Sequence, residues 1–436
     1  MKKTTFILCF LLSMFVSYGQ DTTSNFVTFD IDNFWAAYDK ITTTKDTIEQ
    51  YAYLNTLFLD KKSVGLTAFM EVRDYTPQLY LEVINSYPLF WQSIRANTLK
   101  TAEFIKELEP ELVKFKALYP DLKPAKMYFT IGALRSPGTT QRGIVMIGTE
   151  LAFTDKNTVS SEFPIEIAKG RRTYFDSNPI NDVVLLYVHE YVHTQQKAIV
   201  HNLLSLCMYE GIAEFVSCKI TGKPSSTPSV SFGKNNEIAV KKKFEEDMFR
   251  PRRTDYWLWS DVENVFKMRD LGYYIGYAMA DRYYENAKDK KQALKEMIEL
   301  DYENEKQIEE FVDGTKFLSA SLEKLYNDYD LSRPTVTGIK QFKNGGENVN
   351  PNLTQITVKF TKKMDKRYRS QDVGPLGKAH FPTLKRFDFS EDGQSITLNV
   401  QLEPNKQYQL LLESGYRSEE GIPLKPFLIN FKTGEK

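Results

Sequence analysis

The spacing of apolar residues divides the chain into a mainly helical part and a strand-rich part. Residues 26–125, and most of the chain that follows up to residue 332, repeat apolar positions at three- and four-residue steps. This spacing is typical of helices with one buried face. Within residues 99–119, Pro110 is expected to kink the helix or to start a new one.

Two short apolar segments, residues 125–131 and 143–147, predict strands within the helical part. The Gly- and Thr-rich residues 136–140 predict a loop that joins them, and residues 221–233 predict a surface loop. Further helices are expected at residues 183–197, 201–220, 236–249, 271–287 and 292–329.

After residue 333 the apolar residues alternate with polar ones, which is typical of half-buried strands. Ile356, Val358 and Phe360 share one face of such a strand, and Asn-Gly, Asp-Gly and Pro-Asn pairs mark turns. The patterns together predict an α+β chain. A mainly helical domain with a small β-sheet covers residues 20–332, and an all-β sandwich covers residues 333–436.

Residues 1–19 predict a signal peptide. Two lysines precede an apolar run at residues 6–16, and Ser17 and Gly19 stand where signal peptidase requires small residues, which predicts cleavage just before Gln20. The run is shorter than the ~20 residues that span a membrane. We therefore expect an exported protein, periplasmic or extracellular, whose mature chain has no transmembrane segment.

The net charge of the chain limits the classes of partner that we expect. The formal net charge is +0 and no long basic patch is present, so we expect no nucleic-acid partner.

Cys207 and Cys218 are the cysteines of the mature chain. On one helix they would lie roughly 16 Å apart, too far for a disulfide, so two buried free thiols are expected.

The helix expected at residues 183–197 carries a metal-binding motif, HExxH, from His189 to His193. Side chains four residues apart share a helix face, with Cβ atoms about 5–6 Å apart, so both imidazoles can bind one zinc ion. Glu190 lies beside the first ligand, where it can take a proton from a water that zinc activates. Because the chain has only 4 His, this pairing around a Glu is rarely accidental.

A catalytic zinc site needs a third protein ligand. His201 does not complete the metzincin pattern, because Gln196 occupies the place of its Gly. Glu210 and Glu214 lie on one face of the next expected helix, which is the gluzincin arrangement of two His and one Glu. Spacing leaves both open, and the carboxylate that does not bind zinc could accept a hydrogen bond from a ligand imidazole.

Two resemblances bear on this choice. Residues 210–213, EGIA, resemble the E-G-x-A element of gluzincin aminopeptidases, in which the Glu binds zinc. Residues 29–284 are similar to a family of secreted bacterial zinc-dependent proteases, with Pro137 as one departure from the family's Gly. The matching segments are NFW (33–35), FWQSIR (90–95), IGTE (147–150), HEYVHTQQ (189–196) and GYYIGY (272–277).

The resemblance implies a zinc metallopeptidase that hydrolyses a peptide or protein substrate. It implies that His189, His193 and Glu210 bind Zn²⁺ and that Glu190 is the general base. Related enzymes often stabilise the oxyanion with a Tyr or His from a later helix, which makes Tyr273 and Tyr277 the catalytic candidates.

The strand at residues 143–147 is a second feature of interest. Zinc peptidases place an edge strand shortly before the HExxH helix, where it pairs with an extended substrate. An ordinary sheet strand is the alternative interpretation.

The C-terminal segments VKFTKKMD (358–365), LEPNKQY (402–408), EGIPL (420–424) and FKTG (431–434) resemble the bacterial Ig-like domain of S-layer proteins. Such domains usually act as spacers or adhesion modules, which implies a cell-surface or glycan partner. The alternative function is therefore a non-catalytic, zinc-stabilised surface protein that binds through this domain. A third hypothesis keeps the zinc and Glu190 but has another amide, such as cell-wall peptide, as the substrate.

Overall fold

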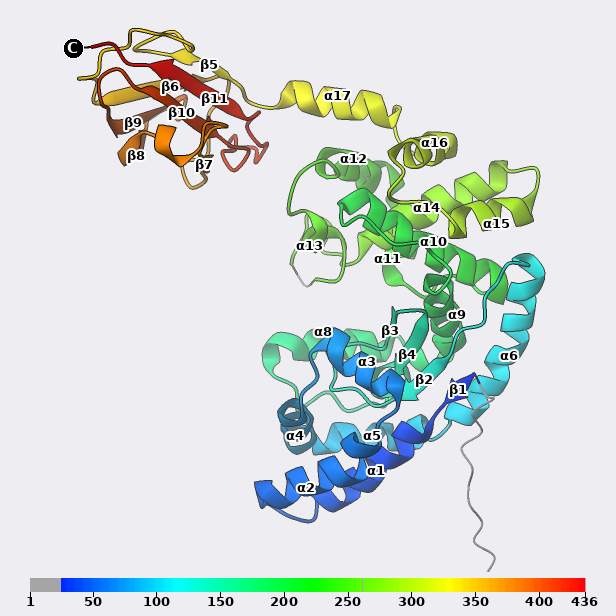
Figure 1. Cartoon of the computed structure of the whole chain (residues 1–436). Coiled ribbons are helices and arrows are strands. Elements are labelled where there is room, and N and C mark those ends of the chain that lie inside the picture. The colour runs from blue at the N-terminus through cyan, green and yellow to red at the C-terminus, as the bar shows by residue number, and fades with distance from the viewer. Residues whose placement is uncertain (1–24, 261, 436) are drawn as a thin grey trace, which may run out of the picture. The chain divides into compact units, whose positions relative to one another are not determined.

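The computed structural model describes residues 25–260 and 262–435 and shows an α+β fold (Figure 1). The predicted signal peptide, with its cleavage site before Gln20, lies outside the described residues. The chain divides into two compact units, which are described in turn. The first unit holds the chain up to Gln196 together with Val216–Pro224, and the second holds Lys197–Phe215 and the chain from Ser225 onward.

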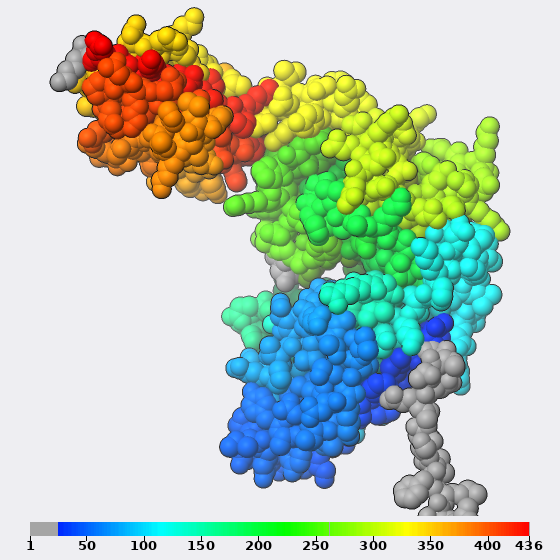
Figure 2. Space-filling view, in the orientation of Figure 1, coloured from blue at the N-terminus to red at the C-terminus, as the bar shows by residue number. Residues whose placement is uncertain are grey.

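The first unit begins with the short helices that the apolar spacing predicted. In the space-filling view, the blue residues of the first helices form one contiguous block (Figure 2). Pro110 lies inside α6 without ending it, because the ring is on the exposed face, where water can satisfy the carbonyl that loses its donor. The helices are α1 (Phe29–Ile41), α2 (Thr47–Leu57), η1 (Leu59–Lys61), α3 (Val64–Arg73), α4 (Pro77–Ser86), α5 (Pro88–Thr98) and α6 (Thr101–Leu118).

An aromatic core holds α1 and α5 together and accounts for two of the sequence motifs. Phe34 and Trp35 of NFW lie with their ring centroids 4.9 and 6.3 Å from that of Trp91 in FWQSIR. Arg95 of the same motif lies over the Trp35 ring, 4.9 Å from its centroid, and forms an ion pair with Asp39. These motif residues therefore serve packing rather than chemistry.

A small sheet follows in the order β1-β2-β4-β3. Strand β2 pairs in parallel with β1 and β4, and β3 runs antiparallel to β4. The strands predicted at residues 125–131 and 143–147 are confirmed as β2 and β4. The bounds are β1 (Phe26–Val27), β2 (Met127–Thr130), β3 (Gly138–Gln141) and β4 (Ile144–Gly148).

The prediction of a loop at residues 136–140 is wrong for its second half, which forms strand β3. Arg142 and Gly143, with φ angles of 50° and 76°, make a tight turn that folds β3 back onto β4. Strand β3 therefore takes the edge of the sheet, and residues 143–147 form an ordinary inner strand, the alternative of the two interpretations. The sequence GTTQ carries no apolar alternation, so this strand depends on its pairing with β4.

The remaining helices of the first unit lead to the motif. They are α7 (Thr149–Ala152), α8 (Ile165–Asp176), η2 (Pro179–Asp182) and α9 (Val183–His193). Helix α9 is buried along nearly its whole length, as its apolar sequence predicted, and it ends at His193 rather than near Lys197. Asp182 stands at its N-cap, but its side chain makes no capping hydrogen bond.

The C-terminal helices are shorter than their periodicity suggested. The single helix predicted at residues 292–329 is three helices, because Asn304 and Ser321 each cap a new start with a side-chain acceptor. Helix α11 occupies part of the loop predicted at residues 221–233. The helices are α10 (Leu203–Thr221), α11 (Pro228–Asn235), α12 (Glu237–Asp247), α13 (Thr254–Trp257), α14 (Leu271–Asn286), α15 (Lys290–Ile298), α16 (Glu305–Thr315) and α17 (Leu322–Ser332).

Residues after Pro334 form antiparallel sheets, as the two-residue alternation predicted. One sheet has the order β5-β6-β9-β8 and the other β11-β10-β7, and their apolar faces share one core (Figure 1). Ile356, Val358 and Phe360 lie in that core. The elements are β5 (Val336–Ile339), β6 (Gln355–Phe360), β7 (Gln371–Asp372), η3 (Lys378–His380), β8 (Thr383–Phe389), β9 (Ser395–Gln401), β10 (Gln407–Leu412) and β11 (Phe427–Lys432).

The structure bears on the two cysteines and on the expected absence of a transmembrane segment. Cys207 and Cys218 are both free and buried, which confirms the expected thiols. Among the described residues, none of the helices combines the length and the apolar character needed to cross a membrane.

Glu150 of α7 is a buried carboxyl group beside the small sheet. Its oxygens accept hydrogen bonds from the backbone N–H groups of Gly132 at 2.8 Å and Leu134 at 3.3 Å. Burial raises the pKa of Glu150 from 4.5 to about 7, because it outweighs these donors and the charge of Arg171. Folding therefore favours the protonated carboxyl, and this stabilisation is present below pH 4.5 and lost as the pH rises through 7.

Replacing Glu150 by Gln should remove this pH dependence. The free energy of unfolding of the wild type should fall by about 3 kcal/mol more than that of Glu150→Gln between pH 4.5 and 7. Urea denaturation of both proteins across this range measures the difference. Asp30, whose pKa burial raises to about 6, leaves a smaller slope of the same sign in the variant.

Glu166→Gln is the control, because Glu166 lies exposed on α8 and its replacement removes the same charge. The wild-type slope should persist in Glu166→Gln. An unchanged slope in Glu150→Gln would contradict the assignment.

Candidate metal centre

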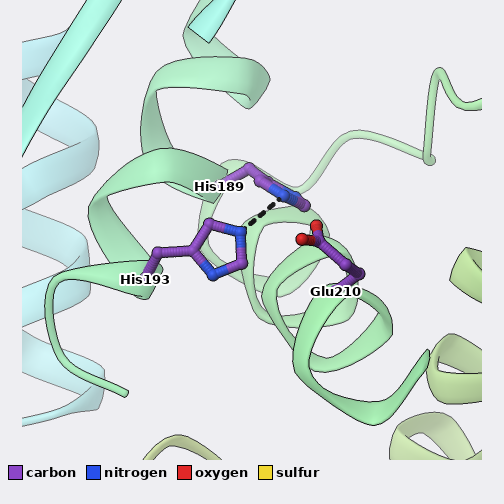
Figure 3. Close-up of side chains that lie close together, drawn as sticks. All are labelled: His189, His193 and Glu210. Carbon is purple, nitrogen blue, oxygen red and sulfur yellow. Dashed lines mark hydrogen bonds between the residues drawn. The ribbon is translucent and has the colours of Figure 1, made fainter. Parts of the chain in front are cut away.

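Helix α9 presents His189 and His193 on one face. The two side chains point toward one another (Figure 3), with their Nε2 atoms 3.1 Å apart and their ring centroids 4.8 Å apart. This geometry follows from the four-residue spacing on a helix whose surroundings fix both rotamers. His189 is buried, with 5% of its surface exposed, and His193 is half-buried.

Glu210 of α10 completes the group. Figure 3 shows its carboxylate directed at the two imidazoles. One ligand atom from each of His189, His193 and Glu210 lies within 4.8 Å of the others, and within the described part of the chain these are the residues that could hold a metal ion. The three predicted ligands are thus brought together.

The donor atoms suit zinc. Tetrahedral zinc bound at 2.0–2.1 Å would separate two imidazole nitrogens by about 3.3 Å, close to the observed 3.1 Å. His193 Nδ1 lies 2.6 Å from Gln196 Oε1, an atom that only accepts hydrogen bonds. Nδ1 therefore carries the proton and Nε2 keeps its lone pair directed at the other ligands, the arrangement that a metal-binding imidazole needs. The role of Gln196 was missed, although it stands in the motif HEYVHTQQ.

Glu214 and His201, the two other candidate ligands, have different surroundings from Glu210. The Glu214 carboxylate accepts hydrogen bonds from the hydroxyls of Ser225 and, at 3.1 Å, of Thr227. His201 is exposed in the segment before α10. The contacts of Glu214 therefore tie the end of α10 to the chain that leads into α11.

Two glycines let α10 and α14 cross closely at Glu210. A Cβ atom at Gly211 would lie 2.3 Å from the backbone nitrogen of Tyr277 and 2.4 Å from Gly276. A Cβ at Gly276 would lie 2.0 Å from the carbonyl oxygen of Cys207. These contacts explain why the EGIA and GYYIGY segments carry glycine at these positions, because any side chain would push the helices apart.

Glu190 faces the edge of the small sheet. The Thr140 hydroxyl of β3 lies 3.0 Å from Glu190 Oε2 and 2.9 Å from the Glu190 carbonyl oxygen. A Cβ at Gly138 would lie 3.0 Å from Glu190 Oε1. Strand β3 therefore confines the Glu190 side chain and gives it a hydrogen-bond donor. Sequence reasoning missed Thr140 because it lies in the predicted loop.

The two tyrosine candidates have different surroundings. The Tyr273 hydroxyl hydrogen-bonds the Glu210 carboxylate, and burial and that carboxylate keep the pKa of Tyr273 well above its usual value, so it remains a donor. The Tyr277 ring instead packs against Phe215, at a centroid distance of 5.5 Å, with the Lys234 ammonium 4.6 Å from its centroid. Tyr273 thus contacts a candidate ligand.

Comparisons with known proteins leave the family open. No family model matches the chain, and no curated protein matches it. Among solved structures, the N-terminal part of the bacterial S-layer protein SbsC is 13% identical, with a TM-score of 0.18 over 93% of this chain and 71% of that chain. Surface layer protein SbsC, domains 1–6, is 14% identical, with a TM-score of 0.19 over 66% and 44%.

A third structure, the S-layer protein rSbsC(31-844), is 12% identical, with a TM-score of 0.19 over 93% of this chain and 45% of that chain. The chain spans less than half the length of the latter two structures. At these TM-scores the likeness supports no assignment of fold or function, so the functional argument rests on the geometry of the site.

Proposed function

We propose that this protein is a secreted zinc metallopeptidase with a gluzincin-like metal site. The observation that carries the proposal is the convergence of His189, His193 and Glu210, with Glu190 directly after His189 on α9. Two imidazoles and one carboxylate are the ligand set of many catalytic zinc sites, in which the fourth position holds water.

Each residue of the site has a separate role in peptide hydrolysis. His189, His193 and Glu210 would hold the zinc, with Gln196 fixing the tautomer of His193. When bound, zinc would supply Lewis acidity, which lowers the pKa of the attacking water and polarises the scissile carbonyl. Glu190 takes the proton from that water and delivers it to the leaving amine.

Thr140 holds the base in place. Its hydroxyl can donate to Glu190 Oε2, which restricts the carboxylate to one side of α9. A general base is effective only within hydrogen-bond reach of the proton it abstracts, so a fixed carboxylate is an advantage.

The edge strand β3 supports an extended peptide as the substrate. One side of β3 pairs with β4, and its other side is the edge of the sheet. The edge of a sheet can add one more strand through backbone hydrogen bonds, which suits a peptide of varied sequence. Because β3 also contacts Glu190 through Thr140, a peptide paired there would lie close to the base.

Tyr273 is the favoured candidate for stabilising the oxyanion. Its hydroxyl lies at the Glu210 carboxylate, whereas the Tyr277 ring packs on Phe215. The phenol carries one hydrogen, so it can donate to the charge that develops on the substrate oxygen by exchanging its hydrogen bond with Glu210 for one with that oxygen.

The C-terminal sheets fit the proposed organisation. We propose that residues 333–436 form an Ig-like sandwich of the S-layer type that acts as a spacer or adhesion module toward a cell-surface or glycan partner. The shared core of the two antiparallel sheets supports a separate module. Export, by the signal peptide proposed at residues 1–19, accords with such a partner.

Metal analysis tests the ligand set. Purified wild type should contain stoichiometric zinc by mass spectrometry, and His193→Ala and Glu210→Gln should contain little, because each removes a ligand. Glu214→Gln is the matched control, since it makes the same substitution on the same helix at a residue bonded to Ser225 and Thr227. Equal zinc content in wild type and His193→Ala would contradict the proposed metal site. Loss of zinc in Glu214→Gln alone would make Glu214 the third ligand.

Replacement of the base separates metal binding from catalysis. Glu190→Gln should retain zinc and lose at least about a hundredfold in peptide hydrolysis, because an amide cannot accept the proton. Digestion of a peptide library by wild type and variant measures this loss and the cleavage preference together. Retained turnover would show that another group acts as the base. Wild type that binds zinc but cleaves no peptide would favour the non-catalytic surface protein.

The Thr140 hydroxyl should affect the rate of peptide hydrolysis. Thr140→Val keeps the shape of the side chain and should lower kcat about tenfold, with KM and zinc content little changed, because only the hold on Glu190 is lost. Thr140→Ser keeps the hydroxyl and should restore most of the rate. Equal rates in Val and Ser variants would refute the role of this hydrogen bond.

A further inference from the structure

Trp259 combines three features that set it apart from the other tryptophans. Its backbone is left-handed, with a φ of 56°, and 51% of its surface is exposed. Its indole Nε1 lies 3.3 Å from the Tyr273 hydroxyl. A bulky side chain rarely adopts a positive φ, and such strain persists only where surrounding contacts enforce it.

The enforcing contacts come from the first turn of α14. The backbone N–H of Trp259 donates to Asp270 Oδ1 at 2.7 Å, and Asp270 stands at the N-cap of α14. Leu258 packs on Gly272, where an added Cβ would lie 2.7 Å from a Leu258 methyl carbon. The strained residue is therefore fixed, by its backbone and its neighbour, to the turn that carries Tyr273.

The hydrogen bonds have a defined direction. An indole N–H can only donate, so the Tyr273 oxygen accepts from Trp259. The phenol then directs its own hydrogen at the Glu210 carboxylate. Accepting one hydrogen bond polarises the hydroxyl and strengthens the one that it donates.

We propose that Trp259 is a positioning residue that holds the Tyr273 hydroxyl on Glu210, so that the chain Trp259–Tyr273–Glu210 orients the third metal ligand. The proposal rests on the metallopeptidase site proposed above and assigns a residue to its support. Partners that orient a metal ligand typically raise metal affinity by tenfold or more, which makes the effect measurable without catalysis.

The first test is spectroscopic and independent of metal and activity. The chain has 4 Trp, and the structure gives each indole N–H a different acceptor: Thr98, the Val83 carbonyl, Asp247 and Tyr273. Labelling with ¹⁵N-tryptophan should give an indole signal for each, and the signal that disappears in Trp259→Phe belongs to Trp259. In Tyr273→Phe that signal should shift while the others stay in place. An unmoved Trp259 signal overturns the proposal.

The second test is a double-mutant cycle on zinc affinity, measured by competition with a chelator. Trp259→Phe keeps an aromatic ring but loses the donor, and it should weaken zinc binding about three- to tenfold. In the Tyr273→Phe background, Trp259→Phe should have no further effect, because its acceptor is gone. Equal weakening in both backgrounds would refute positioning through Tyr273.

Trp257→Phe is the matched control. It removes an indole donor two residues away whose acceptor is Asp247, and zinc affinity should stay within about twofold of wild type. Wild type that binds no zinc at all would defeat the proposed function, whereas the indole shift would still decide whether Trp259 holds Tyr273.

In peptide hydrolysis, Trp259→Phe should lower kcat with little change in KM. A role confined to stability of the fold would instead lower the melting temperature and leave the kinetics of the folded enzyme unchanged.

Discussion

At the crossing of α10 and α14, backbone meets backbone with no side chain between them. An added Cβ at Gly276 would lie 2.0 Å from the Cys207 carbonyl oxygen, and one at Gly211 would lie 2.3 Å from the Tyr277 nitrogen. Glu210 directly precedes Gly211, so the close approach brings this carboxylate to the Tyr273 hydroxyl. Tyr277, one turn further along α14, packs its ring on Phe215.

Strand β3 sets a second constraint, on the base. Its pairing with β4 depends on the turn at Arg142 and Gly143, since GTTQ has no apolar alternation that would bury one face. Once paired, β3 brings the Thr140 hydroxyl to Glu190 and leaves only a hydrogen atom at Gly138 facing that side chain. A strand without an apolar pattern thus acquires its position from its neighbour and in turn restricts the carboxylate beside it.

Helix and strand periodicity predicted a helical part followed by a strand-rich part, as the structure shows, and its errors have physical causes. The helix expected at residues 292–329 is broken by local caps at Asn304 and Ser321, which compete with the periodic pattern. Pro110 leaves α6 intact because it lies on the exposed face. The NFW and FWQSIR motifs, which marked a resemblance to proteases, form an aromatic core between α1 and α5. These motif residues therefore contribute to packing.

The sequence by itself determined the α+β organisation and the pairing of His189 with His193, because helix geometry places residues four apart on one face whatever the surroundings. Only the tertiary structure decided which residues join that pair. Glu210 and Glu214 share a helix face, and local spacing cannot separate them. The hydroxyls of Ser225 and Thr227 engage Glu214, while Glu210 turns toward the imidazoles. Thr140 and Trp259 likewise owe their roles to contacts between residues far apart in the sequence, which local spacing does not predict.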